Sequence, residues 1–161
     1  MSWVLHRVDD RLIHGQVLIA WGARFHPDRM WIADDAIAAS AWERDLFAQA
    51  APGIGVRVEG VAAAAAAYAA EAAAPGAAFL LVRDLRTARR LVEAGARVPA
   101  FNLGGLHYAP GKTRLHEYVY LDDADRADAR ALLAAGVALE VQDVPASRPQ
   151  PLAALDPALA P

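Results

Sequence analysis

Cysteine is absent from the chain. Disulfides, thiol nucleophiles and the usual structural zinc and iron–sulfur sites all need cysteine, so these classes are excluded. An excess of positive charge is also missing, because 16 Lys and Arg residues stand against 19 Asp and Glu, with a formal net charge of -3. The basic residues are spread along the chain rather than massed. Nucleic acid is therefore not an expected partner.

Long hydrophobic runs are missing as well. A membrane-spanning helix needs roughly 18 uninterrupted apolar residues, and no segment supplies them. The first residues, MSWVLHRVDD, reach charged side chains too early for the apolar core of a signal peptide. We therefore expect a soluble chain, and the lack of cysteine fits a reducing cytoplasm.

Three catalytic signatures are absent: GxxxxGK followed by Ser or Thr, GxSxG, and HExxH. Nucleotide hydrolysis, serine acyl transfer and zinc proteolysis therefore have no supporting motif.

Short β-rich runs alternate with alanine-rich amphipathic stretches along the 161 residues. This alternation predicts an α/β fold: an open, mostly parallel seven-stranded sheet with helices on both faces. The length suits one domain with a full core. Strands are expected at 3–8, 29–34, 55–60, 77–82, 99–104, 116–121 and 138–144, and helices at 16–25, 36–50, 61–74, 84–95 and 123–136.

Helix-capping residues support these boundaries. Asp84 and Asp122 stand at expected N-caps, and Gly95 and Gly136 at expected C-caps. No helical pattern separates the fifth and sixth strands, so we expect that pair to be antiparallel at a sheet edge.

The chain divides into a domain at 1–145 and a proline-rich tail at 146–161. Proline disfavours regular structure, so the tail is expected to be extended or mobile, with docking on a partner as the alternative.

Ligands of open parallel sheets gather beyond the carboxyl ends of the strands. The segment DDRLIHG follows the first expected strand and places His14 just before a helix that opens near Gly15 and Gln16. Unpaired N–H groups at a helix start favour an anion, and Gly15 lets the backbone approach it closely. Arg11 offers forked donors to phosphate oxygens.

The two aspartates of this segment, Asp9 and Asp10, could hold one ring nitrogen of His14 or clamp Arg11. Together these groups suit the acceptance of a phosphoryl group on His14. That transfer needs positioning and charge stabilisation, which an arginine and N–H groups provide without a metal or other cofactor. The alternative is a turn histidine that caps a backbone group, beside a surface ion-pair cluster.

Two other loops are candidates. Asp34 and Asp35 could bind a metal, but aspartates after a strand more often cap the next helix. The loop after the fifth strand could fold over a phosphate or could be only a flexible connection. Its candidate residues are Asn102, Gly104, Gly105, His107 and Lys112.

Both RVDDRLIHGQV and NLGGLHYAPGKTRL resemble segments of the IIB component of the mannose/fructose/sorbose-type sugar phosphotransferase system. The resemblance covers about residues 3–145. It implies a protein-phosphohistidine–sugar phosphotransferase in which His14 is phosphorylated, on Nδ1, and Arg11 contacts the phosphate. The residues Asp9, Asp10, Gly15 and Gln16 would support them.

The resemblance also implies partners: a phosphorylated IIA protein that loads His14, and membrane IIC and IID components that hold the sugar. The chain would be cytoplasmic and peripherally associated with that transporter, with a homodimer as an open alternative. Val17, Leu18 and Trp21 could help to dock IIA, although their helical spacing is more typical of core.

Two other functions stay open. The chain could be a regulatory phosphoacceptor that reports the state of the phosphotransferase cascade without sugar transport. It could also be a binding module with an inert His14.

Overall fold

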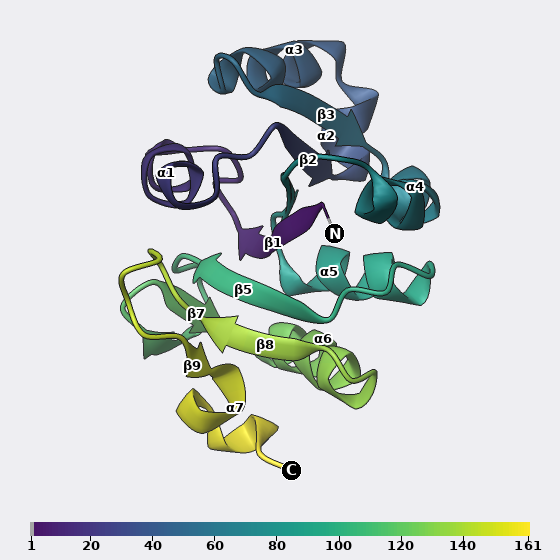
Figure 1. Ribbon diagram of the computed structural model, residues 1–161. Helices are drawn as coiled ribbons and strands as arrows, with labels where there is room; N and C mark the ends of the chain where they lie inside the picture. The colour runs from purple at the N-terminus through teal and green to yellow at the C-terminus, as the bar shows by residue number, and fades with distance from the viewer. Residues whose placement is uncertain (1) are drawn as a thin grey trace.

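The computed structural model describes residues 2–161. In this range, seven strands form one sheet in the order β3, β2, β4, β1, β5, β8, β9 (Figure 1). Neighbours from β3 to β8 are parallel, and β9 pairs antiparallel with β8 at the edge. The strands are β1 Trp3–Asp9, β2 Arg29–Ala33, β3 Gly55–Glu59, β4 Ala78–Val82, β5 Ala100–Gly105, β8 Ala138–Val141 and β9 Gln150–Pro151. The expected fold class is confirmed.

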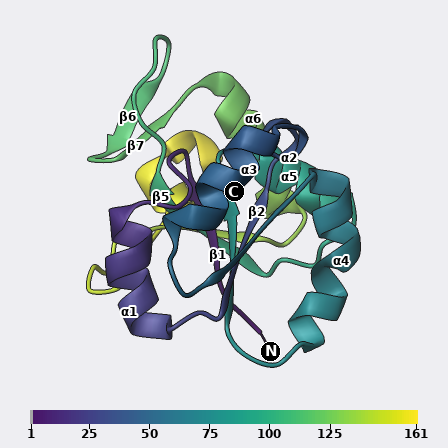
Figure 2. The same ribbon diagram turned by 90° about the horizontal axis from the view of Figure 1, so that it is seen from above.

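Two further strands form a separate antiparallel hairpin, which projects from the molecule at the edge opposite the N-terminus (Figure 2). They are β6 Thr113–His116 and β7 Val119–Leu121. The helices are η1 Gln16–Trp21, α1 Gly22–Phe25, α2 Asp35–Ala39, α3 Ala41–Ala50, α4 Val61–Ala73, α5 Leu85–Glu93, α6 Asp123–Ala134, α7 Leu152–Leu155 and η2 Pro157–Leu159.

Helices cover both faces of the sheet, so its central strands bury side chains on each side. In β4, Phe79 and Leu81 pack with η1, α1 and α2, whereas Leu80 and Val82 pack with α4, α5 and α6. A strand that alternates between two apolar faces appears in the sequence as a continuous hydrophobic run, as AFLLV does.

The prediction of one strand at 116–121 was wrong. The chain turns at Glu117 and Tyr118, and Thr113–His116 pairs with Val119–Leu121. The predicted antiparallel pair of the fifth and sixth strands was also wrong, because among the described residues β7 meets the chain after β5 only at one parallel bridge, between Val119 and Leu106. The seventh strand of the sheet is supplied by Gln150–Pro151, and the antiparallel edge is formed by this strand against β8. A proline suits an edge strand, because it need not donate to a further neighbour.

The tail is ordered from Gln150 onward, so the expectation of an extended or mobile segment was wrong for this part. The side chains of Leu152 and Leu159 are 0% and 5% exposed and belong to the core on the α6 side of the sheet. Arg126 of α6 donates to Asp156 at 2.6 Å. The tail therefore packs against the domain that precedes it.

The expected caps are present. Asp84 and Asp122 accept hydrogen bonds from the third backbone N–H of α5 and α6. Gly95 and Gly136 follow these helices with φ values of 107° and 82°, a left-handed conformation that glycine adopts at low cost. The predicted helix at 36–50 is divided at Ser40, whose side chain caps α3. None of the helices in residues 2–161 is long and apolar enough to cross a membrane.

Candidate functional site

The segment DDRLIHG forms a tight turn at the carboxyl end of β1. The amide of Leu12 donates to the carbonyl of Asp9 at 2.9 Å, and Leu12 has a φ of 54°. Leu12 and Ile13 are buried, which anchors the turn between its polar neighbours. A helix follows directly: η1 and α1 are continuous, and the amide of Leu18 donates to the carbonyl of His14. His14 therefore lies at the start of a helix, as predicted.

Asp9 is the centre of the site. Its buried carboxylate accepts hydrogen bonds from Nε2 of His14 at 2.8 Å, from Nη2 of Arg7 at 3.1 Å and from the backbone amide of Arg11 at 3.1 Å. Burial alone would raise the pKa of Asp9, but the bond from His14 and the charge of Arg7 outweigh it and hold the pKa below its ordinary value. Asp9 is thus ionised at neutral pH.

This contact assigns the tautomer of His14. An ionised carboxylate only accepts hydrogen bonds, so the proton of a neutral imidazole lies on Nε2. The Nδ1 atom then carries the lone pair, and no hydrogen bond to it is formed by the residues that the structure describes. The His14 side chain is 14% exposed. It presents an available nitrogen at the carboxyl edge of the sheet.

Arg7 fixes Asp9 from beneath. The Arg7 side chain is fully buried, and its Nη1 donates to Oδ1 of Asn102 at 2.5 Å and to the carbonyl of Gln142 at 3.1 Å. Its Nη2 also donates to the carbonyl of Asp143, and its guanidinium lies 5.3 Å from the ring centre of Trp21. Burial lowers the pKa of Arg7, and the charge of Asp9 opposes that shift. With five acceptors or π contacts around it, Arg7 cannot easily move.

Arg7 is not among the site residues predicted from the sequence. The signal was present, since an arginine within the apolar run of β1 must be buried with partners or must point to solvent. Those partners, the carbonyls of Gln142 and Asp143, lie far along the chain and could not be read from local sequence.

Arg11 lies on the solvent side of the same carboxylate. Its Nε is 3.7 Å from Oδ1 of Asp9, its side chain is 47% exposed, and its Nη2 lies 3.4 Å from Oε1 of Gln16. A Cβ added at Gly15 would meet nothing within 4 Å. Arg11, Gly15 and Gln16 are therefore brought together around His14, with open space beside Gly15.

The loop that follows β5 supports the turn between Asp9 and His14 but contributes little to the surface around His14. Asp10 accepts from the backbone amide of His107 at 2.8 Å and lies 2.6 Å from Nδ1 of the same histidine. A Cβ on Gly104 would lie 1.8 Å from Arg7, and one on Gly105 would lie 2.9 Å from Asp9. These two glycines are therefore needed so that β5 can pass close to the buried pair.

Lys112 is not brought to this cluster. Its Nζ donates to Oδ2 of Asp125 at 2.6 Å, at the start of α6. Asn102, by contrast, bonds Arg7 and so belongs to the layer that supports Asp9.

The carboxylates of Asp34 and Asp35 both accept hydrogen bonds from backbone amides at helix starts. Asp34 accepts from the amide of Ile37 at 2.9 Å, and Asp35 accepts from the amide of Val61 at the start of α4 at 2.8 Å. Each also pairs with an arginine, Arg83 or Arg90. The prediction that these aspartates cap the next helix is confirmed for Asp34, whereas Asp35 caps α4 instead.

An open α/β sheet with a carboxylate-held histidine at its carboxyl edge defines a class of protein suited to carry a group on that histidine. The chain belongs to the family described as PTS system sorbose subfamily IIB component, whose model matches residues 3–158. It is therefore a IIB component of a sugar phosphotransferase system, a phosphocarrier of the protein-phosphohistidine–sugar phosphotransferase class.

Named relatives agree with this membership. The N-acetylgalactosamine-specific phosphotransferase enzyme IIB component 1 of Escherichia coli (strain K12) is 33% identical over 144 residues, which are 88% of this chain and 90% of that protein. The mannose-specific EIIAB component of the same strain is 35% identical over 141 residues, 87% of this chain but 44% of that longer protein. The solved IIBSor domain of the sorbose permease from Klebsiella pneumoniae superposes with a TM-score of 0.86 at 31% identity, covering 96% of both chains.

Proposed function

We propose that His14 is the residue on which this IIB component accepts the phosphoryl group, and that the group is carried on Nδ1. The observation that carries the proposal is the hydrogen bond from Nε2 of His14 to Asp9. Because that bond occupies Nε2, the free lone pair is on Nδ1, which makes Nδ1 the nucleophile.

The loading step balances without a proton transfer. The lone pair of Nδ1 forms a bond to phosphorus, and the bond between phosphorus and the donor's nitrogen breaks, returning its electron pair to the donor. His14 keeps its proton on Nε2 and becomes positively charged as the new bond forms. Oδ2 of Asp9 lies 2.8 Å from Nε2 and stabilises this charge.

In the second transfer, a sugar hydroxyl oxygen attacks phosphorus and the electron pair of the P–N bond returns to Nδ1. The hydroxyl proton passes to a base at the site that holds the sugar. His14 is then neutral again and ready to be reloaded.

We assign the phosphoryl oxygens to Arg11 and to the N–H groups of the first helical turn after Gly15. Arg11 is half exposed and its guanidinium lies near the turn, and Gly15 leaves room for the oxygens. Gln16 would hold Arg11 in this position. Five further residues would hold the turn and the Asp9 carboxylate in position: Asp10, Asn102, Gly104, Gly105 and His107.

The family implies a IIA donor and IIC and IID membrane components as partners, and with them a cytoplasmic chain at the membrane surface. We propose that the donor contacts Ile19, which is 76% exposed one helical turn beyond His14. Ile19 and Leu18 line a groove of about 530 Å³ together with Ala23 and Ile54. Val17 and Trp21, two residues considered for docking from the sequence, are buried in the core instead.

The test is phosphorylation of the purified chain by phosphoenolpyruvate, the general enzymes of the system and a cognate IIA protein. Intact mass at alkaline pH should rise by one phosphate, which should be lost on acidification because phosphohistidine is labile to acid. The His14→Ala variant should gain none. A His14→Ala variant that still gains the phosphate would refute the assignment.

Nitrogen and phosphorus NMR of the phosphorylated protein determines separately which ring nitrogen of His14 carries the phosphoryl group. A signal from phosphorus on Nε2 would contradict the geometric argument. Adding membranes that contain IIC and IID then tests the second transfer: sugar phosphate should appear as phosphate leaves His14, and a stable phosphoprotein would favour the regulatory alternative.

A further inference from the structure

Strands β1 and β5 separate toward their amino ends. The two strands pair only from Arg7 and Asn102 onward, whereas the first half of β1 pairs with β4 alone. Trp3 and His6 therefore face an opening in the sheet, and Pro99 forms its other side. This opening lies at the end of β1 opposite the His14 turn.

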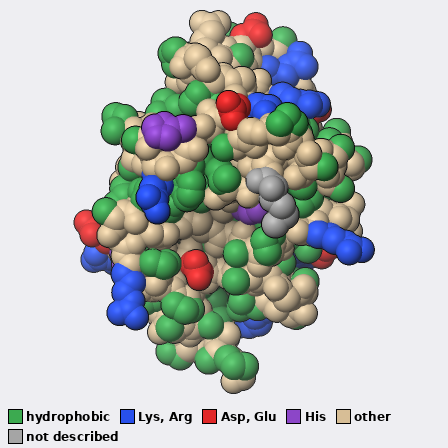
Figure 3. Space-filling model, viewed as in Figure 1, with side chains coloured by type: hydrophobic (Ala, Val, Ile, Leu, Met, Phe, Trp, Pro, Cys, Tyr) green, Lys and Arg blue, Asp and Glu red, His purple; other side chains and the backbone are tan. Residues whose placement is uncertain are grey.

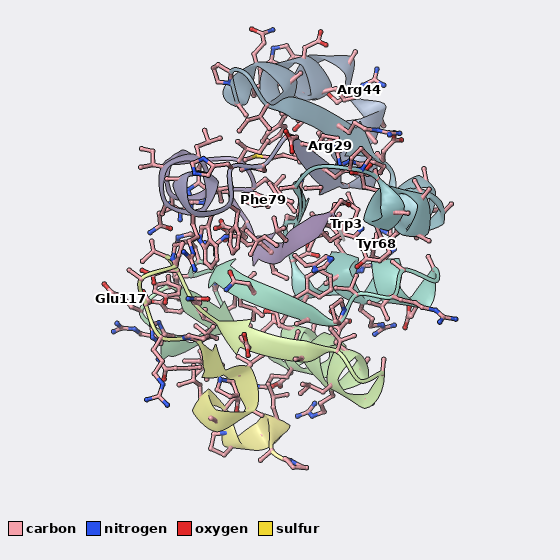
Figure 4. The ribbon with its side chains drawn as sticks, viewed as in Figure 1. Trp3, Arg29, Arg44, Tyr68, Phe79 and Glu117 are labelled. Atoms are coloured by element: carbon pink, nitrogen blue, oxygen red, sulfur yellow. The ribbon has the colours of Figure 1, made fainter. Side chains whose placement is uncertain are left out.

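This opening forms a cavity of about 430 Å³ on the face of the sheet that α4 covers. We name it the amino-end cavity. Figure 4 shows Trp3 and Tyr68 next to each other beside α4. On the face of the molecule seen from the same side, Lys and Arg side chains lie mostly toward the margins (Figure 3). The cavity is lined by Trp3, His6, Ala65, Tyr68, Ala69, Ala72, Gly95, Arg97 and Pro99. Its volume is in the range typical of small-molecule sites, roughly 300–1,000 Å³.

The aromatic walls offer flat apolar surface, because their polar atoms are already paired. The rings of Trp3 and Tyr68 stack at 5.2 Å between centres with an angle of 12°. Nε1 of Trp3 donates to the carbonyl of Tyr68 at 3.1 Å, and the hydroxyl of Tyr68 lies 2.8 Å from Nε2 of His6. The alanines of α4 complete an apolar lining that suits a planar ring.

One charge remains. Burial lowers the pKa of His6 to about 4, so that this imidazole is neutral at physiological pH. Arg97 is exposed and forms no salt bridge with any residue in the range 2–161. Of the described residues that line the cavity, Arg97 is thus the one that carries charge at pH 7. A guanidinium at the edge of an apolar cavity selects an anionic group.

We propose that the amino-end cavity is a binding site for a small aromatic monoanion, whose ring system lies among Trp3, His6 and Tyr68 and whose anionic group meets Arg97. The site is independent of phosphorylation at His14, from which the length of β1 separates it. It adds a small-molecule ligand to a chain whose family membership implies protein partners.

Anilinonaphthalene sulfonate is a suitable probe, because it is an aromatic monoanion whose fluorescence rises in an apolar site. Titration of the full chain should show saturable binding to one site. Ala69→Leu places a larger side chain at the cavity and should weaken binding by about tenfold or more, since the apolar volume is then filled. Ala70→Leu is the matched control: it lies next to Ala69 on the exposed side of α4 and does not line the cavity, so affinity should be unchanged.

Arg97→Gln tests the charge. It should weaken binding of the sulfonate several-fold and leave phenylnaphthylamine, which has the same rings without the sulfonate, unaffected. Equal affinity of the sulfonate for wild type and for a folded Ala69→Leu would overturn the site. An Arg97→Gln effect that is the same for both probes, or absent for both, would overturn the assignment of an anion.

Discussion

Asp9 forms hydrogen bonds to both Arg7 and His14, and these bonds hold both side chains in place. Beneath it, Arg7 is fully buried and needs an anion, because an unpaired buried guanidinium is costly. Above it, His14 needs a fixed tautomer. A single ionised carboxylate satisfies both, so the stability of the fold and the reactivity of the histidine depend on the same side chain.

Asp9→Asn should therefore lower both properties. The amide keeps an acceptor for Nε2 of His14 but loses the charge, so we expect phosphorylation to slow about 10- to 100-fold. The free energy of unfolding should fall by about 3 kcal/mol, because Arg7 loses its buried counterion. Rapid-quench phosphorylation by loaded IIA and urea unfolding measure the two effects.

The control is Asp10→Asn, a neighbouring aspartate whose side chain is 36% exposed and bonds His107 at the surface. Its unfolding free energy should stay within about 0.5 kcal/mol of wild type. If Asp9→Asn were phosphorylated at the wild-type rate, the proposed stabilisation of the charged ring by Asp9 would be wrong.

Two glycines near the site should respond oppositely to the same change. A Cβ at Gly104 would lie 1.8 Å from the guanidinium of Arg7, so Gly104→Ala must displace a buried ion pair and should cost about 2 kcal/mol or more. Gly15 has a helical φ of -51° and open space, so Gly15→Ala should leave stability unchanged or slightly raised. Thermal unfolding compares them, and equal melting temperatures would contradict the close contact at Gly104.

His6 should make the fold sensitive to moderate acid. In the folded chain the pKa of His6 is about 4, below the ordinary value of 6.5. Between these two pH values, His6 is therefore protonated in the unfolded chain but neutral in the folded chain. The free energy of unfolding should thus fall by about 2–3 kcal/mol as the pH drops from 6.5 to 4. Urea unfolding across this range measures it, and His6→Phe should show a shallower fall; identical pH profiles would exclude His6 as the cause.

At the scale of helices and strands, the sequence predicted correctly those features that depend only on neighbouring residues, such as helix caps. Asp84 and Asp122 cap the helices they precede, because a cap needs only a side-chain oxygen next to the first free N–H groups. Ser40 carried the same signal and divides α2 from α3, yet the alanines on either side favour helix and conceal it.

The placement of strands depends on distant partners and could not be predicted in the same way. HEYVYL has the alternation of one strand, and the turn at Glu117 and Tyr118 contains no glycine or proline to mark it. The edge strand Gln150–Pro151 is too short for a periodic signal and is specified by the pairing that β8 offers. At the site, likewise, the turn from Asp9 to His14 was predictable, but the buried support from Gln142 was not.

The exposed face of η1 gives a prediction about partner docking. Ile19→Glu replaces an exposed apolar side chain near His14 by a charge, and we expect kcat/KM for phosphorylation by loaded IIA to fall about tenfold, as at the apolar centre of an interface. Leu46→Glu is a matched control, since Leu46 is 51% exposed on α3. Stopped reactions with limiting IIA compare the variants, and equal losses in both would argue against a specific contact at Ile19.

At the scale of the whole molecule, the last twelve residues, 150–161, complete the sheet instead of trailing from it. They supply the edge strand beside β8, bury Leu152 and Leu159 on the α6 side, and pair Asp156 with Arg126 at 2.6 Å. The hydrophobic core therefore extends beyond residue 145, where the proline-rich segment begins, and the stability of the domain should depend on the tail.

Truncation after residue 145 should accordingly lower the free energy of unfolding by about 4 kcal/mol, since two buried leucines are removed and the apolar surface beneath them is exposed. For a domain of ordinary stability this is a large fraction of the total. Urea unfolding of the shortened chain measures the loss. Truncation after Leu159 removes only the exposed Ala160 and Pro161 and should leave the midpoint unchanged. A wild-type midpoint after truncation at 145 would mean that the tail packs on the domain without contributing to its cooperative unfolding.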